Sequence, residues 1–319
     1  MASSRTTPAT DVWLPIPPAQ IDGLPDTFTY HFWDGDEEFP ADPADCGFYV
    51  VPYMKGKAVS VRPLAQMTSL RVVQTLTAGI DHVLDAVPDL PAETLLCNAR
   101  GVHDASTAEL ALVLTLAALR QLPQFVRAQD AGEWCPGVHE ALADKTVLIV
   151  GHGAIGAAVE ERLVPFEVAE VLRVARSART VARGPVHALG SLPELLPRAD
   201  VVILCTPLTD ETRGLAGAGF LSGMKDGALL VNVARGGVVD TGSLLGELES
   251  GRLRAALDVT DPEPLPAGHP LWHAPNTLIT PHVGGPTSAF LPRAKRLLSS
   301  QLNRWAAGEP LEHTVVVAG

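Results

Sequence analysis

Apolar runs of strand length recur through the second half of the chain. After Lys145 the runs TVLIV, EVLRV, DVVILC, ALLVNV, LRAALDV and NTLIT follow one another, separated by helix-length segments such as AAVEERLV and TGSLLGELES. Strands that are apolar without alternation are buried on both faces, and strands that alternate with helices pair in parallel. The pattern therefore predicts a doubly wound parallel sheet covered by helices on both faces.

The first hundred residues carry a weaker pattern of the same kind. The short apolar runs CGFYVV and LRVVQTL alternate with turn-rich pieces and with a helix-like stretch near PLAQM. This arrangement predicts a smaller α/β unit. Because 319 residues exceed the usual size of one hydrophobic core, we expect two domains.

Two longer helical runs flank the second part of the chain. The run over residues 106–128 is apolar on more than one face, so we expect it to be buried between domains or subunits, with a break at Pro123. The final run, over residues 288–308, follows the last predicted strand. We expect it to pack back on the first domain.

Net charge, apolar stretches and cysteine spacing limit the classes of binding partner and the cellular location that we expect. A net charge of −12 gives no general attraction to nucleic acid or to anionic membranes. The start of the chain lacks the apolar stretch of a signal peptide, and the most apolar helical run is too short to span a bilayer, so we expect a cytoplasmic protein. The four cysteines show neither metal-ligand nor redox spacing, which predicts buried thiols and no metal: Cys46, Cys97, Cys135 and Cys205.

A glycine-rich loop connects the run TVLIV to the next helical segment. It reads GHGAIG and meets the strand, turn and helix context of the dinucleotide-binding fingerprint. Its first glycine would permit the tight turn, the second would let backbone approach a pyrophosphate, and the third would let helix and strand pack. A plain glycine turn without a ligand is the alternative. The predicted phosphate-binding residues are Gly151, Gly153, Ala154, Ile155 and Gly156.

The following strand ends where an NAD site would carry an acidic residue for the adenosine ribose, about 20 residues beyond the glycine loop. This chain has Arg176, Ser177 and Arg179 there, and no carboxylate. An arginine pairs with a phosphate, whereas it cannot accept hydrogen bonds from ribose hydroxyls. We therefore expect NADP(H) to be preferred, with NAD(H) possible. The alternative is a solvated basic turn without cofactor preference.

Four polar residues follow successive predicted strands and should meet at one edge of the sheet: Arg235, Asp258, Glu263 and His282. Arg235 could hold a substrate carboxylate. Glu263 beside His282 would favour the imidazolium, which can protonate a carbonyl oxygen as a hydride arrives. Taken singly, each has an ordinary structural explanation, as a surface ion-pair residue, a loop carboxylate or a strand-end histidine. Together they favour an active site.

Ordered motifs along nearly the whole chain resemble the D-isomer-specific 2-hydroxyacid dehydrogenases. The resemblance rests on TAGIDHV, TAEL, GHGAIG, CTPLTDETRGL, LLVNVARGGVVD, ALDVTDPEPLP and TPHVGG in this order. It implies two Rossmann-like domains, the smaller one flavodoxin-like. It places the substrate domain in residues 1–103 and 284–319 and the dinucleotide domain in residues 104–283. It also implies a homodimer formed through the dinucleotide domain.

The resemblance also assigns roles to individual residues. The catalytic triad would be Arg235, Glu263 and His282. Asp258 resembles the partner of the nicotinamide carboxamide, and the Ala78–Gly79 loop resembles the one whose amides receive the substrate carboxylate. The residues expected along the cofactor are Thr206, Pro207, Thr212 and Val233.

The expected activity is NAD(P)H-dependent reduction of a small 2-oxo acid to the D-2-hydroxy acid. The Arg176–Ser177 pair resembles the NADPH-preferring glyoxylate/hydroxypyruvate reductases of the family. Tyr53 and Met54 would line the substrate pocket with more apolar surface than a two-carbon acid needs, which leaves the substrate open. Two alternatives stand beside this reading: a dehydrogenase of another oxyanion, such as phosphite or a biosynthetic intermediate, and a nucleotide-sensing binding protein like the C-terminal-binding corepressors.

Overall fold

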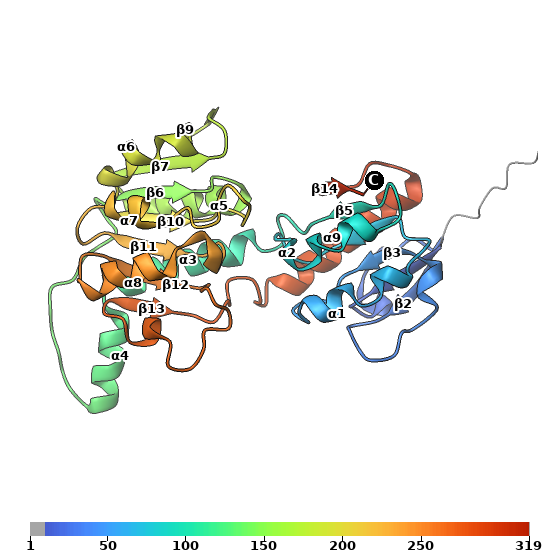
Figure 1. The fold of residues 1–319 in the computed structure, drawn as a ribbon, viewed down its shortest axis with the longest axis horizontal. Coiled ribbons are helices and arrows are strands. Elements are labelled where there is room, and N and C mark those ends of the chain that lie inside the picture. The colour runs from blue at the N-terminus through green and yellow to red at the C-terminus, as the bar shows by residue number, and fades with distance from the viewer. Residues whose placement is uncertain (1–9, 319) are drawn as a thin grey trace, which may run out of the picture. The chain divides into compact units, whose positions relative to one another are not determined.

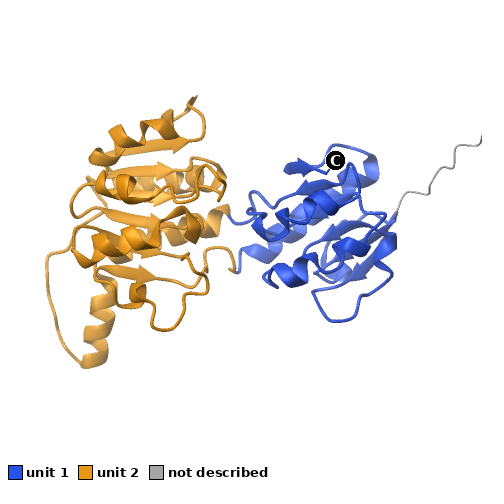
Figure 2. Ribbon diagram, in the orientation of Figure 1, with its two compact units in different colours: residues 1–103, 288–319 blue, residues 104–287 orange. Residues whose placement is uncertain are grey.

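The computed structural model describes residues 10–318, and the chain divides into two compact units (Figure 2). Unit 1 is Met1–His103 with Ser288–Gly319, and unit 2 is Asp104–Thr287. The first division falls between residues 103 and 104. The chain returns to unit 1 after Thr287 rather than at residue 284, because the amide and carbonyl groups of Gly284 bond to Asp258 and Thr107 of unit 2.

Unit 2 is built on an eight-stranded sheet in the order β13-β12-β11-β10-β6-β7-β9-β8 (Figure 1). All neighbouring strands are parallel except β8 and β9. Its parallel strands have the 3-2-1-4-5-6 order of dinucleotide-binding domains, with one further strand, which confirms the predicted fold class. The strands are β6 (Thr146–Val150), β7 (Glu170–Ala175), β8 (Arg179–Val181), β9 (Gly184–Ala188), β10 (Val201–Leu204), β11 (Leu229–Asn232), β12 (Arg254–Leu257) and β13 (Thr277–Ile279).

The helices of unit 2 are α3 (Asp104–Leu119), α4 (Leu122–Ala131), α5 (Ala154–Leu163), α6 (Leu192–Leu195), α7 (Ala218–Ser222) and α8 (Thr241–Glu249). The long predicted helix breaks before Pro123 rather than at it. Gln121 adopts a left-handed φ of 57°, and Pro123 lies in the first turn of α4, where its missing N–H costs nothing. Most of α3 is buried inside unit 2, against the sheet and α5.

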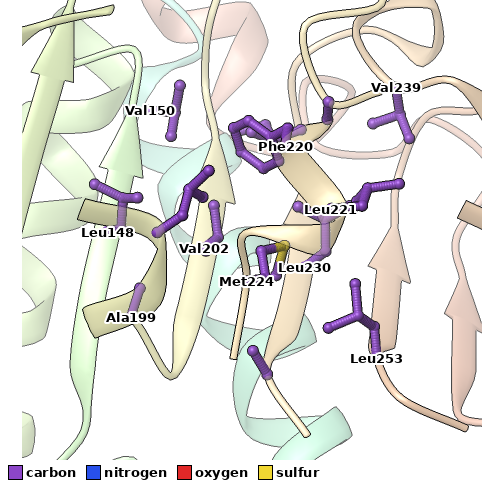
Figure 3. Packing of buried hydrophobic residues seen from close by; sticks show 14 of the residues in the cluster. Leu148, Val150, Ala199, Val202, Phe220, Leu221, Met224, Leu230, Val239 and Leu253 are labelled. Atoms are coloured by element: carbon purple, nitrogen blue, oxygen red, sulfur yellow. The ribbon is translucent and has the colours of Figure 1, made fainter. Parts of the chain in front are cut away.

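Two hydrophobic clusters cover the two faces of this sheet. On β6, Leu148 and Val150 belong to one cluster, whereas Val147 and Ile149 belong to the other. Figure 3 shows the first cluster, in which Leu148 lies near Val202 of the neighbouring strand. Alternate side chains of a strand point to opposite faces, so an unbroken apolar run is what a sheet buried on both sides requires.

Unit 1 contains a six-stranded sheet in the order β14-β5-β4-β3-β1-β2, parallel except for β14. Without β14 this is the 2-1-3-4-5 order of flavodoxin-like folds. Its strands are β1 (Asp11–Leu14), β2 (Thr29–Phe32), β3 (Cys46–Val50), β4 (Val72–Gln74), β5 (Leu95–Cys97) and β14 (Thr314–Val317), and its helices are α1 (Lys57–Val61), α2 (Asp81–Leu84) and α9 (Phe290–Ala307).

The C-terminal helix α9 joins the core of unit 1, as predicted. Its Leu298 and Leu302 are fully buried beside Phe48 of β3, and its Trp305 ring lies 5.2 Å from the Phe48 ring. The apolar face of α9 thus covers a sheet whose strands, apart from β14, come from the opposite end of the chain.

The described residues test the expectations about a membrane-spanning helix and about buried thiols, whereas the expectation about a signal peptide concerns residues outside them. Within residues 10–318 no single helix is long and apolar enough to span a bilayer; α3 and α4 meet that criterion only as a pair bent by 64°. Cys46 and Cys97 are buried and Cys205 is half-buried, whereas Cys135 is exposed, so the prediction of four buried thiols was wrong for Cys135. The first nine residues, which entered the signal-peptide argument, lie outside the described part.

Candidate active site

The glycine loop after β6 is fixed by close backbone packing. Gly151 has a φ of 104°, and a side chain there would meet the backbone of Cys205 and Thr206 at 2.6 Å. A Cβ at Gly156 would lie 2.5 Å from the carbonyl oxygen of Gly151. Both positions therefore require glycine, as the fingerprint predicts.

The middle of the loop is open. A Cβ on Gly153 would meet no atom within 4 Å, and α5 begins directly after it with Ala154 and Ile155. The first amides of a helix lack partners within the helix and attract anions. Beside the loop, the Thr206 hydroxyl is buried and has no hydrogen-bond partner among residues 10–318. Open backbone and an unpaired hydroxyl at the switch point of the sheet fit a dinucleotide.

A buried ionic network connects the glycine loop to the neighbouring helix and strand. The imidazole Nε2 of His152 lies 2.7 Å from Glu160 Oε2, and Arg173 Nε donates to Glu160 Oε1 at 2.7 Å. Burial raises the pKa of Glu160, but the hydrogen bonds from Arg173 and His152 outweigh it, so the pKa is lowered overall. The network ties the loop to α5 and to β7.

Basic side chains lie where the adenosine ribose is expected. The Arg176 Nε atom is 3.3 Å from Glu211 Oε2, and the Arg179 guanidinium donates to the carbonyl oxygen of His152 in the glycine loop. Ser177 is exposed in the turn after β7. Arg176 therefore faces the loop after β10, whereas Arg179 is held at the glycine loop.

Glu263 and His282 form the acid–base pair of the predicted triad. The His282 Nδ1 atom lies 2.6 Å from Glu263 Oε1, with 42% of the histidine and 40% of the glutamate side chain exposed. The pKa of Glu263 is lowered, chiefly by its hydrogen bond with His282 and further by the charge of Arg235. An ionised Glu263 accepts, so Nδ1 carries the proton and Nε2 is the atom that can exchange one with a substrate.

Asp258 anchors the segment that carries His282. Its Oδ1 accepts from Thr280 Oγ1 at 2.6 Å and from the Val283 amide at 2.9 Å, and its Oδ2 accepts from the Gly284 amide at 2.9 Å. The Asp258 residue as a whole is 3% exposed. Since a carboxylate offers about four acceptor sites, three are used within the chain. The contact with a nicotinamide carboxamide stays a prediction.

The backbone of His282 is held as tightly as its side chain. Its amide donates to the Asp258 carbonyl at 2.8 Å, and its φ is 53°, a left-handed value that costs energy in a residue other than glycine. The hydrogen bonds of Asp258 to the residues on both sides of His282 stabilise this conformation.

The loop after β11 presents Arg235. Its Nη1 donates to the Ala234 carbonyl at 2.8 Å, and Asn232 accepts from the Ala234 amide and donates to the Arg235 carbonyl. A Cβ on Gly236 would lie 1.8 Å from the Thr260 carbonyl oxygen. Backbone contact at Gly236 thus sets the Arg235 loop directly against the loop that leads to Glu263.

Of the residues expected along the cofactor after β10 and β11, Thr212 has an internal role, Val233 is buried and Pro207 is exposed. The Thr212 hydroxyl donates to the Pro207 carbonyl at 2.6 Å and accepts from the Thr209 amide at 2.8 Å, which fixes the loop after β10. Val233 is buried at the end of β11, whereas Pro207 is exposed. Their contacts with a cofactor stay predictions.

The residues expected to bind substrate through unit 1 lie in two loops. Hydrogen bonds to the Ala78–Gly79 loop end on its carbonyl oxygens, from Asn98 Nδ2 at 2.9 Å and Thr77 Oγ1 at 2.6 Å. These hydrogen bonds do not use the backbone N–H groups of Ala78 and Gly79, which are the groups expected to bind the substrate carboxylate. The Tyr53 ring stacks at 4.0 Å on Phe290, and burial raises its pKa to about 12, whereas Met54 is exposed.

Some site residues escaped sequence reasoning. Asn232 lies inside the motif LLVNVARGGVVD but received no role, although a polar residue at the end of a buried strand is itself a signal. Glu160 lies in the helical segment after the glycine loop, where a carboxylate looks like an ordinary surface residue. Asp258 was predicted at the site, but its three hydrogen bonds depend on a loop conformation that composition does not reveal.

A dinucleotide-binding sheet with an acid–base pair at its carboxyl edge defines a nicotinamide-dependent oxidoreductase. The family model for the NAD-binding domain of D-isomer specific 2-hydroxyacid dehydrogenases matches residues 112–284, more than half of the chain. The chain belongs to this family, as its motifs suggest.

Relatives of known structure or name agree with this assignment. The human glyoxylate reductase/hydroxypyruvate reductase is 34% identical over 291 residues, which cover 88% of each chain. A D-isomer specific 2-hydroxyacid dehydrogenase from Xanthobacter autotrophicus, solved with NADPH, is 30% identical with a TM-score of 0.80 over 96% of this chain and 98% of its own. An NADPH-dependent glyoxylate/hydroxypyruvate reductase from Sinorhizobium meliloti, solved with NADP and sulfate, is 26% identical with the same TM-score and coverage.

The anchoring role of Asp258 can be tested by Asp258→Asn. The amide nitrogen cannot accept, so one of the bonds to Thr280, Val283 or Gly284 is lost, at a cost of about 1–3 kcal/mol in the free energy of unfolding. Amide hydrogen exchange should accelerate in residues 280–284. Asp130→Asn, at an exposed position of α4, is the control. Unchanged exchange in the Asp258 variant would show that the carboxylate does not hold this segment.

Proposed function

We propose that this protein reduces a small 2-oxo acid to the D-2-hydroxy acid, with NADPH as the preferred reductant. The observation that carries the proposal is the 2.6 Å contact between Glu263 and His282 at the sheet edge that also bears the glycine loop. When bound, the nicotinamide supplies the hydride. The chain supplies binding groups and the proton.

His282 delivers that proton. With Nδ1–H held by the Glu263 carboxylate, the protonated imidazole gives the proton on Nε2 to the carbonyl oxygen as the carbonyl carbon receives the hydride, and the product is an alcohol. Neutral His282 then takes a proton from solvent, and in the reverse direction it accepts the proton of the alcohol.

The carboxylate of the substrate needs cationic or amide partners. Arg235, next to the Glu263 loop, carries a planar guanidinium suited to a carboxylate. In unit 1, the backbone amides of the Ala78–Gly79 loop could also donate hydrogen bonds to a carboxylate. Relatives named glyoxylate or hydroxypyruvate reductases support 2-oxo acids of two or three carbons, and the exposed Met54 would also admit a bulkier one.

The catalytic role of His282 is tested by His282→Ala. Loss of general acid catalysis should lower kcat/KM for glyoxylate or hydroxypyruvate by about 10² to 10⁴-fold, while the dissociation constant of NADPH stays constant. The exposed His273 provides the matched control as His273→Ala. A loss below about tenfold would contradict the assignment.

Preference for NADPH rests on Arg176 and Arg179, two cations at the expected ribose position with no carboxylate in the same turn. Two of the similar structures contain NADPH or NADP. We propose that Arg176 binds the 2′-phosphate, with Ser177 and Arg179 as further donors.

Replacement of the cation in Arg176→Ala should weaken NADPH binding about tenfold, because hydrogen bonds to charged groups contribute about 1.5–3 kcal/mol and this site is exposed. Calorimetric titration with NADPH and NADH gives the two dissociation constants, and that of NADH should change little. Arg198→Ala removes another exposed, ion-paired arginine and is the control. An unchanged NADPH affinity would show that Arg176 does not bind the 2′-phosphate.

We also propose a homodimer formed through unit 2. Large apolar side chains are exposed on α4 and on the segment after it, with Trp134 93% exposed and Val138 fully exposed. Leu122 and Val126 of α4 are exposed as well. Exposed apolar groups of this kind mark interfaces.

Sedimentation equilibrium should show twice the mass of one chain for the wild type, and Trp134→Ser with Val138→Ser should shift it toward one chain, since burial of these side chains would be lost. Val315→Ser, an exposed valine of unit 1, should leave the mass unchanged. A wild type that stays monomeric at micromolar concentration refutes the dimer.

A further inference from the structure

One ion pair crosses the expected adenosine end of the dinucleotide site. It joins Arg176, directly after β7, to Glu211, in the loop after β10, with Nε and Oε2 at 3.3 Å. In the sheet, β6 lies between β7 and β10, and the glycine loop follows β6. The pair therefore spans the two loops on either side of the phosphate-binding turn.

The backbone beneath Glu211 is held in place. Thr212, the next residue, is 5% exposed, and its hydroxyl bonds to both Pro207 and Thr209 within the loop. The Glu211 side chain itself is 61% exposed and that of Arg176 is 70% exposed. A fixed loop thus presents a solvent-accessible carboxylate next to Arg176.

The Glu211 side chain is a carboxylate, and residues 175–179 contain none. The two hydroxyls of an unphosphorylated adenosine ribose need an acceptor, and an ionised carboxylate is an acceptor with two oxygens. A 2′-phosphate instead needs a cation and is repelled by a neighbouring negative charge. Glu211 can supply the acceptor for the ribose hydroxyls, and Arg176 can supply the cation for the 2′-phosphate.

We propose that Glu211 determines the cofactor specificity of this enzyme. It accepts hydrogen bonds from the ribose hydroxyls of NADH, and it competes with the 2′-phosphate of NADPH for Arg176. The inference rests on the proposed dinucleotide function and deepens it, because the acid missing after β7 is supplied from the loop after β10. Such a site keeps NADH usable while Arg176 favours NADPH.

Solvent exposure limits the size of the competition. Exposed ion pairs contribute about 0.2–1 kcal/mol, and salt screens them. Loss of the Glu211 charge should therefore strengthen NADPH binding about threefold at low salt and less at high salt. Loss of a charged acceptor for NADH should weaken its binding about tenfold.

The test is Glu211→Gln, which keeps size and hydrogen-bonding ability but removes the charge. Dissociation constants for NADPH and NADH, and for the fragments 2′,5′-ADP and 5′-AMP, are measured by calorimetry. We expect opposite effects: tighter binding of NADPH and 2′,5′-ADP, and weaker binding of NADH and 5′-AMP. Asp210→Asn removes the neighbouring charge and should leave all four constants within about twofold, because exposed charges away from a contact contribute little.

NADH affinity unchanged by Glu211→Gln overturns the proposal. So does an equal effect of Asp210→Asn, because a general change in charge would then explain the result. The proposed NADPH preference fails separately, if wild-type protein binds NADH as tightly as NADPH or if Arg176→Ala has no effect. Opposite effects of Glu211→Gln on the two cofactors would establish the role of Glu211 in either case.

Discussion

The geometry of the candidate active site depends on the buried carboxylate of Asp258. It lies at the end of β12 and receives hydrogen bonds from residues 280, 283 and 284, so a residue with left-handed backbone is held between fixed neighbours. His282 can then meet Glu263 from a rigid segment. A side chain placed in this way needs little reorganisation when a ligand binds.

The two ends of the dinucleotide site use charge in different ways. At the glycine loop, His152, Glu160 and Arg173 are buried and mutually satisfied, which favours a single conformation. At the ribose end, Arg176 and Glu211 are exposed, and their interaction is weak enough to be replaced by a ligand. The buried network supports the loop, whereas the exposed pair is the one that we propose discriminates between cofactors.

Sequence reasoning predicted the elements whose signal is local. Six of the parallel strands of unit 2 appear as continuous apolar runs, and the requirement for glycine at Gly151 and Gly156 follows from the fingerprint. The β8–β9 hairpin was missed because its strands are short and contain Gly184 and Pro185, which read as a turn. The helix break was placed at Pro123 although the left-handed residue is Gln121, and the Arg176–Glu211 pair joins loops that are far apart in sequence.

In the proposed reaction, a hydride passes from the nicotinamide to the carbonyl carbon of a 2-oxo acid while His282 protonates the oxygen. The most direct measurement is turnover of glyoxylate and hydroxypyruvate with NADPH that carries deuterium at both C4 positions, followed by mass spectrometry and chiral separation of the products. The proposed reaction gives one deuterium at C2 of each hydroxy acid, and the D-isomer from hydroxypyruvate. A product without deuterium, an L-hydroxy acid, or no product from a wider set of 2-oxo acids despite NADPH binding would contradict it.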